Sequence, residues 1–257
     1  MKTEKNQQLK DSTGLKNIVV LDNVVKKYED QLVLKNISFN IFNGQILGYV
    51  GPNGSGKTTT IKILLGLLKP DSGEINILKK DPYLDDIETY DVKKQIGFVL
   101  ESDLLNLNLT GFKNILYWAE LYDNSNSENT HERVNEVIDI VNLAKWKDTL
   151  VKNYSHGMKK RLLFARAIVH NPQILILDEP TNGVDLESRL IMRNLIKKFA
   201  SEDKIIFFSS HDLNEVQKIC TKIIILNKGE KMFDGTLEEL KIKHPNKSLE
   251  DIYLKLT

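Results

Sequence analysis

Eight consecutive residues, Gly51-Pro52-Asn53-Gly54-Ser55-Gly56-Lys57-Thr58, match the phosphate-binding pattern GxxxxGK[ST] at every fixed position. Glycines allow a tight turn in which several backbone N–H groups converge on phosphate oxygens. Lys57 supplies a positive charge to the β and γ phosphates, and the Thr58 hydroxyl is placed to ligate Mg²⁺. The pattern predicts that a nucleoside triphosphate is bound by Asn53, Gly54, Ser55, Gly56, Lys57, Thr58 and Thr59.

The residues on either side of this loop have the order that a phosphate site requires. Ile46 to Val50 is a short apolar run typical of a buried parallel strand. From Thr59 to Leu68 the apolar residues recur at helical spacing, and Pro70 follows. A helix N-terminus with free N–H groups would therefore point at the phosphates.

Carboxylates and a histidine follow two later strands. The apolar run Ile174 to Leu177 leads into Asp178 and Glu179, at the strand end where ligands bind in parallel sheets. Asp178 would hold Mg²⁺ through water, and Glu179 would orient and deprotonate an attacking water. His211 ends a neighbouring strand and could reach the γ-phosphate, although a lone histidine there is more often structural.

Tyr28 lies in a polar connection between two predicted strands, Ile18 to Val25 and Gln31 to Phe42. Its position alone allows either stacking on a flat base or capping of the β-layer. The alternation of Ile37, Phe39 and Ile41 with polar residues, and the Asn43-Gly44 turn signal that follows, predict an antiparallel β-layer ahead of the phosphate loop.

The composition limits the class of protein. The chain has 257 residues, 41% hydrophobic, with 36 basic and 35 acidic side chains, so no strong field attracts nucleic acid. A single cysteine, Cys220, excludes an internal disulfide and fits a reducing cytoplasm. Residues 1–16 are expected to be a mobile polar tail without a signal peptide. No apolar run is long enough to span a bilayer, so any action on a membrane requires another chain.

The middle of the chain is predicted to be helical. Helical patterns run from Thr110 to about Ala144, interrupted by a polar loop at 123–129, and Ser155 is placed to cap a further helix. The run Lys159-Lys160-Arg161 in that helix is interpreted as a solvated face. Two short charged helices, 237–243 and 249–256, are predicted to close the chain.

In this order the motifs resemble an ATP-binding cassette (ABC) ATPase, the nucleotide-binding subunit of a transporter, over about Ile18 to Leu256. The resemblance rests on Tyr28, GPNGSGKTT, a strand ending at Glu101, YSHGM, ILILDEP, Asp185 and His211. It implies an α/β fold with a P-loop ATPase core, an N-terminal antiparallel β-layer and an inserted helical subdomain. The expected domain is 17–257, with core segments at about 17–100 and 171–235, the helical subdomain at about 104–170 and C-terminal helices at 236–257.

The resemblance also implies a site shared between two subunits. Ser155, His156, Gly157 and Asp185 would complete, in trans, the ATP site of a second cassette. Two residues depart from the family's usual pattern. Glu101 replaces the usual glutamine, and we expect it to contact both the attacking water and Mg²⁺; His156 replaces the first glycine of the LSGGQ signature. We hypothesise that a partly protonated His156 adds a phosphate contact.

The expected function is ATP hydrolysis that powers a membrane transporter through head-to-tail closure of two cassettes, with ATP and Mg²⁺ bound. The expected partners are a second ATP-binding subunit and a separate transmembrane permease, which would dock near Ser102 to Gly111 and hold the cassette at the cytoplasmic face of the cell membrane. Glu101, the YSHGM signature and the short C-terminus resemble exporters of drugs, peptides or ions. The alternatives are an importer ATPase, a non-transport ABC ATPase, and a degenerate cassette that only binds ATP.

Overall fold

The computed structural model describes residues 17–84, 87–101, 105–122, 127–245 and 247–257. The predicted tail at 1–16 and part of the predicted docking segment, 102–104, lie outside these ranges. The strands are β1 (Asn17–Tyr28), β2 (Gln31–Phe42), β3 (Ile46–Val50), β4 (Ser72–Ile77), β5 (Ile96–Val99), β6 (Ile174–Asp178), β7 (Ile205–Ser210), β8 (Lys222–Asn227) and β9 (Glu230–Gly235).

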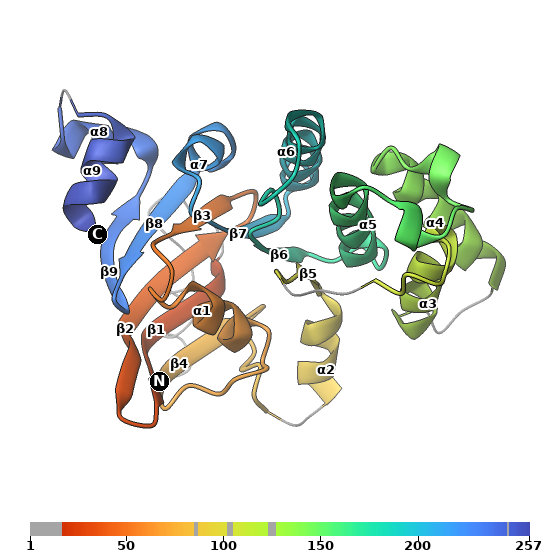
Figure 1. Ribbon diagram of the computed structural model, residues 1–257. Coiled ribbons are helices and arrows are strands. Elements are labelled where there is room, and N and C mark those ends of the chain that lie inside the picture. The colour runs from red at the N-terminus through yellow and green to blue at the C-terminus, as the bar shows by residue number, and fades with distance from the viewer. Residues whose placement is uncertain (1–16, 85–86, 102–104, 123–126, 246) are drawn as a thin grey trace.

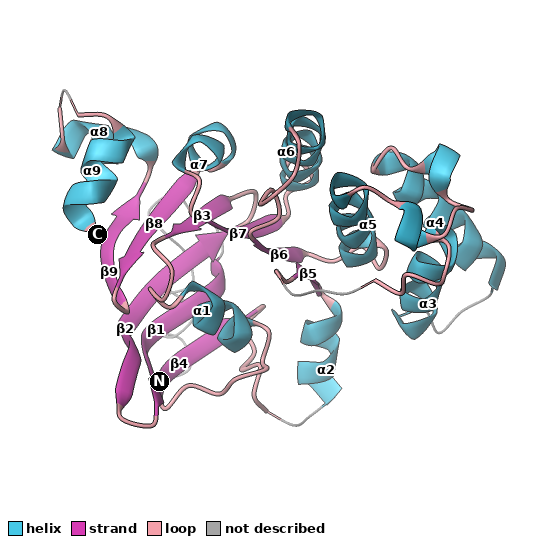
Figure 2. Cartoon of the chain, viewed as in Figure 1, coloured by secondary structure: helices cyan, strands magenta, loops and turns pink. Residues whose placement is uncertain are grey.

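The helices surround these strands. They are α1 (Lys57–Leu64), α2 (Ile87–Lys94), α3 (Gly111–Tyr122), α4 (Ser127–Ile140), α5 (His156–Ile168), α6 (Leu186–Ala200), α7 (Leu213–Ile219), α8 (Leu237–Lys243) and α9 (Leu249–Leu256), with short 3₁₀ helices η1 (Ala144–Trp146) and η2 (Val151–Asn153). Figure 2 shows that the strands fill one part of the molecule while α3, α4 and α5 form a purely helical part.

Two sheets organise the core. The larger sheet has the order β5-β6-β7-β3-β8-β9 and is parallel except for the antiparallel pair of β8 and β9. The smaller sheet, β2-β1-β4, is antiparallel. This arrangement confirms the predicted α/β class and the predicted β-layer, to which β4 adds a third strand.

The parallel strands of the larger sheet are buried on both faces, which explains why they are largely apolar runs. Ile174 and Ile176 of β6 pack into a cluster with α1 and the smaller sheet. Leu175 and Leu177 of the same strand pack into a second cluster with α5 and α6. Because side chains alternate along a strand, one apolar run serves both cores.

Helices α3, α4 and α5 pack on one another at one end of the molecule, and the antiparallel sheet lies at the other end (Figure 1). Helix α5 also contacts β5 and α6, so it joins the helical group to the large sheet. Its N-cap is Ser155, whose side chain accepts from the Met158 N–H, as the sequence predicts.

Some local predictions differ from the structure. Of the polar segment predicted as a loop at 123–129, residues 123–126 lie outside the described ranges, and the rest is helical from Ser127, where α4 begins. A polar start does not prevent this helix, because Val134, Val137 and Ile138 further along α4 are buried. Helix α2 was not predicted; its largest apolar side chains, Ile87 and Tyr90, are exposed while Val92 is buried, so its apolar residues do not form the single stripe that reveals a helix. The final helices α8 and α9 match their predictions, and each begins with a capping box.

Candidate nucleotide-binding site

The phosphate loop connects β3 to α1 and is shaped by two glycines that cannot carry a side chain. A Cβ at Gly51 would collide with the carbonyl oxygen of Leu226, and one at Gly56 would lie 2.6 Å from Leu34 Cδ2. Gly56 also has φ +110°, in the left-handed region that favours glycine. Packing between the sheets and backbone geometry therefore both require glycine here.

The loop leaves donors free to bind an anion. Helix α1 begins at Lys57 with Gly56 as N-cap, no capping side chain and no acidic residue in its first turn. The buried Ser55 hydroxyl has no hydrogen-bond partner among the residues that the structure describes. Unpaired N–H groups at a helix N-terminus and an unpartnered hydroxyl fit a phosphate group, whose oxygens accept hydrogen bonds.

Lys57 is held in the loop by its own backbone. Its Nζ donates to the Gly51 carbonyl at 2.7 Å and to the Pro52 carbonyl at 3.2 Å. Burial lowers the pKa of Lys57, while the nearby charges of Glu179, Asp178 and Glu101 act in the opposite direction. The ammonium group is thus aimed at the region that the predicted catalytic carboxylates surround.

Asp178 ends β6 and is buried, with its carboxylate bonded to a neighbouring strand. The Ser209 hydroxyl of β7 donates to Asp178 Oδ1 at 2.5 Å. Burial raises the pKa of Asp178, and the bond from Ser209 partly counteracts that shift. A fixed carboxylate beside the phosphate loop fits Mg²⁺, which prefers one or two carboxylates plus phosphate and water oxygens.

Glu179 and His211 form a direct pair. His211 Nδ1 lies 2.9 Å from Glu179 Oε1, and the Glu179 N–H donates to the Ser209 hydroxyl at 3.1 Å. Glu179 has φ +48°, a left-handed conformation that is unusual for a glutamate. The turn thus holds this carboxylate in a fixed place beside His211, where it could take a proton from water.

One cavity of about 420 Å³ collects most of the predicted residues. Tyr28 lies at its edge with its ring 43% exposed, and it is the last residue of β1 instead of a loop residue, paired with Gln31. The described lining consists of Tyr28, Gln31, Val33, Asn53, Gly54, Gly56, Lys57, Thr58, Thr59, Lys62, Glu101, Asp178, Glu179, Asn182 and His211. Base, phosphate, metal and water positions are therefore all available in one cavity.

The residues predicted to act in trans lie elsewhere. Ser155, His156 and Gly157 are at the start of α5, and Asp185 caps α6 by accepting from the Ser188 N–H at 2.8 Å. Hydrogen bonds to backbone and side chain of Ser188 lower the pKa of Asp185. None of these four residues lines the described part of the nucleotide cavity.

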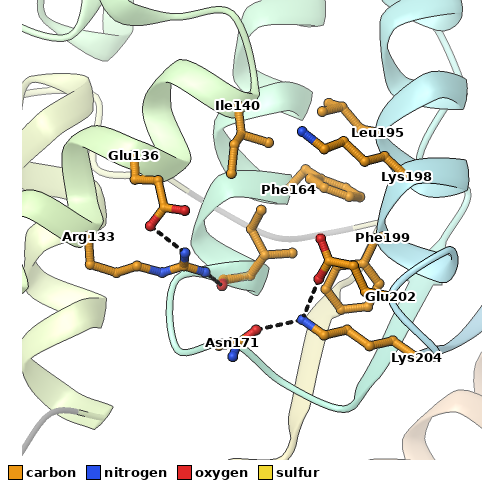
Figure 3. Close-up of a pocket in the computed structure, with 11 residues that line it drawn as sticks. Arg133, Glu136, Ile140, Phe164, Asn171, Leu195, Lys198, Phe199, Glu202 and Lys204 are labelled. Atoms are coloured by element: carbon orange, nitrogen blue, oxygen red, sulfur yellow. Dashed lines mark hydrogen bonds and ion pairs between the residues drawn. The ribbon is translucent and has the colours of Figure 1, made fainter.

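A second cavity, also about 420 Å³, lies between α4, α5 and α6 (Figure 3). Its floor is apolar, and two of its rim cations, Arg133 and Lys204, already have partners. Arg133 donates to the carbonyls of Val169 and Ile168, both at 2.9 Å, and to Glu136 at 2.6 Å. Lys204 bonds Asn171 and Glu202. This cavity offers few free polar groups, so we assign the chemistry to the nucleotide cavity.

A family model described as ABC transporter matches residues 34–182. The chain belongs to the ABC transporter family. It is 37% identical to the bacitracin transport ATP-binding protein BcrA of Bacillus licheniformis, over 91% of this chain and 72% of that protein. It is 34% identical to the linearmycin resistance ATP-binding protein LnrL of Bacillus subtilis, over 85% of this chain and 69% of that protein.

Among solved structures, the fold matches a dimeric ATP-binding cassette in a post-hydrolysis state bound to ADP and Pi. The TM-score is 0.78 and the identity 30%, over 85% of this chain and 98% of that one. The ABC cassette described here is thus an ATP-binding protein and an ATPase, as its sequence predicts. Within the described ranges, no helix is long and apolar enough to cross a membrane.

The cassette contains site residues that sequence reasoning missed. Ser209 bonds Asp178 and Glu179, and its only sequence signal is a hydroxyl in an otherwise apolar strand. Asn182, Lys62 and Gln31 line the nucleotide cavity, and no motif marks them.

The interpretation of Lys159-Lys160-Arg161 as a solvated face was wrong for two of its residues. Lys160 is buried, and its charge partly counteracts the rise that burial causes in the pKa of Asp178. Arg161 is half-buried and donates to the carbonyls of Val141 and Asn142 at the end of α4. Long basic side chains can bury their stems in a helix interface when their ends find acceptors, which a charge pattern cannot reveal.

Proposed function

We propose that this ABC cassette is the ATP-hydrolysing subunit of a membrane exporter, attached through a separate permease to the cytoplasmic face of the cell membrane. The observation that carries the proposal is the convergence of Lys57, Asp178, Glu179 and His211 on one cavity beside an uncapped helix N-terminus. The relatives named for bacitracin transport and linearmycin resistance favour export over import.

Each side chain has a role that its surroundings support. Loop N–H groups and Lys57 bind phosphate oxygens, and Tyr28 stacks on the base. Glu179 accepts a proton from the attacking water, and His211, 2.9 Å from it, orients that carboxylate and contacts the γ-phosphate. Thr58, Asp178 and Glu101 would hold Mg²⁺, which when bound neutralises charge on the phosphates. Glu101 also accepts from the attacking water.

The site is completed by a second subunit. Ser155, His156, Gly157 and Asp185 lie away from the cavity of their own chain, and Ser155 and His156 are exposed at a helix N-terminus that can face phosphate. The dimeric post-hydrolysis cassette with the same fold supports head-to-tail pairing. ATP binding closes the pair, and product release opens it.

The permease is proposed to dock on the segment after Glu101, up to Gly111. Residues 105–111 are described, and Leu107 there is exposed while Leu105 packs on the core. An exposed apolar side chain on a fixed backbone fits a short cytoplasmic helix of a membrane partner.

The substitution Glu179→Gln tests the proposed function. It keeps the size of the side chain and removes the base, so hydrolysis should fall by at least ~100-fold while ATP-bound dimers accumulate. Phosphate release measures the first effect, and light scattering after size exclusion with ATP measures the second. Gln217→Glu, on the exposed side of α7, serves as a control for a Glu/Gln exchange outside the nucleotide cavity.

Two outcomes would contradict the proposal. Hydrolysis that survives Glu179→Gln would remove Glu179 from its role as base. A wild-type chain that binds ATP without turnover would favour the degenerate cassette. Co-purification from membranes with a chain that spans the bilayer would support the transporter, whereas co-purification with ribosomes or DNA would support the non-transport alternative.

A further inference from the structure

His156 stands where the family's signature pattern has glycine, and the structure gives its ring a contact within its own chain. His156 Nε2 lies 3.3 Å from the carbonyl oxygen of Asn182. The ring also lies against Gly183, where an added Cβ would be 3.4 Å from the same nitrogen. A glycine at 156 has no side chain to make either contact.

The acceptor, Asn182, belongs to the turn that carries the catalytic glutamate. The Asn182 N–H donates to the Glu179 carbonyl at 3.1 Å, which closes the turn 179–182. Asn182 and Glu179 both line the nucleotide cavity. One hydrogen bond and one short turn therefore connect the exposed start of α5 to the carboxylate at the reacting centre.

The start of α5 is already packed against the start of α6, so its position is well defined. A Cβ at Gly157 would lie 2.6 Å from the Ser188 Cβ, and Ser188 is buried and bonded to Asp185. This close packing holds α5 near the core, but it involves α6 and not the turn 179–182. The hydrogen bond from His156 to Asn182 links the signature residues 154–158 to the turn 179–182.

We propose that His156 is a positioning residue that acts in cis, holding the turn 179–182 in place relative to the signature end of α5. This inference rests on the proposed function, because it assigns Glu179 as the base. When Ser155 and Gly157 engage a second subunit, the bond from His156 transmits their position to Glu179 of the same chain. The hypothesis that His156 contacts phosphate in trans becomes the competing outcome.

The key comparison is His156→Ala with His156→Gln. Alanine keeps the helix start and removes the donor, whereas glutamine restores an N–H donor on a side chain of similar reach. An ordinary hydrogen bond corresponds to a roughly three- to tenfold effect. We therefore expect kcat for ATP to fall about three- to tenfold in the alanine variant and to recover at least half of that loss in the glutamine variant.

Dimerisation separates the cis role from a trans role. In a Glu179→Gln background, the ATP concentration for half-maximal dimerisation should be the same whether residue 156 is His, Ala or Gln, because the bond lies within one chain. His244→Ala, at the end of α8 and remote from the site, is the matched histidine control. Melting temperatures check that each variant is folded.

An unchanged kcat in His156→Ala, or a loss that glutamine does not recover, would overturn the positioning role. A rise of threefold or more in the ATP concentration for dimerisation would also overturn it, in favour of a phosphate contact in trans. If the wild-type chain itself neither hydrolyses ATP nor dimerises, the proposed function fails instead, so the two failures are distinct.

Discussion

The nucleotide cavity and the cavity between α4, α5 and α6 have the same volume, about 420 Å³, but their polar groups differ in kind. In the cavity between α4, α5 and α6, Arg133 and Lys204 are bonded to nearby carbonyls and carboxylates, above an apolar floor that includes Phe164 and Phe199. In the nucleotide cavity, the N-terminus of α1 is uncapped and the Ser55 hydroxyl is unpartnered among the described residues.

The difference shows that volume alone does not identify a binding site. Charges that are already paired stabilise the fold and offer little to a ligand, while free donors cost stability until a ligand satisfies them. The first cavity therefore serves the packing of α4 and α5 on α6, and the second serves chemistry. Variants of residues that line each cavity test that division.

Removing one lysine from each cavity should give opposite results. Lys57→Ala should lower ATP hydrolysis by at least ~1000-fold, about 4 kcal/mol, and prevent ATP-driven dimerisation, because no other lysine lies in the phosphate loop. Its fold, followed by circular dichroism, should remain. Lys198→Ala removes a rim lysine of the other cavity, which makes no ion pair with any described residue, and should leave hydrolysis within twofold. Equal losses in both variants would refute the division.

Arg133→Met should affect stability and not catalysis. The substitution removes the donor to two carbonyls at the end of α5, so the free energy of unfolding should fall by about 2 kcal/mol. Urea titration measures this, and hydrolysis per folded molecule should be unchanged. Glu136→Gln, which breaks only the exposed ion pair, should cost at most about 0.5 kcal/mol. If Glu136→Gln lowered the free energy of unfolding as much as Arg133→Met, the stabilisation would come from the ion pair and not from the hydrogen bonds to the carbonyls.

Asp178→Asn should stabilise the protein while abolishing its hydrolysis. Burial raises the pKa of Asp178 above its unfolded value. As pH rises, the unfolded chain releases this proton first, so stability is lost as pH rises through the folded pKa. At pH 7.5 the native state carries the free-energy cost of burying the Asp178 carboxylate. Asparagine still accepts a hydrogen bond from Ser209 but has no charge to bury. We expect a gain of about 1 kcal/mol, roughly 2–4 °C in Tm, that shrinks toward pH 4.

Tyr28 should contribute to ATP binding through its aromatic ring and not through its hydroxyl. Tyr28→Ala should raise the KM for ATP about two- to fivefold, since stacking contributes about 0.5–1 kcal/mol, and Tyr28→Phe should match the wild type. Steady-state kinetics at several ATP concentrations measure both variants. A loss in Tyr28→Phe as large as that in Tyr28→Ala would mean that the hydroxyl and not the ring is recognised.

The amino-acid order was sufficient to predict the phosphate loop, the two carboxylates after an apolar strand, the antiparallel layer and the cap at Ser155. These features depend on residues adjacent in the chain: glycine geometry, strand alternation and capping side chains act over a few positions. For the same reason, the two final helices were predicted at their correct bounds.

Which distant side chains meet depends on how the segments pack in three dimensions. Ser209 bonds Asp178 and Glu179 across neighbouring strands, Lys160 is buried beside the site, and His156 reaches the Asn182 carbonyl. Each contact joins segments that a local pattern treats as separate, because a hydroxyl, a lysine or a histidine has no periodicity that reveals its partner. The physical reason is that burial and pairing are set by how α5, β6 and β7 pack, which no single segment encodes.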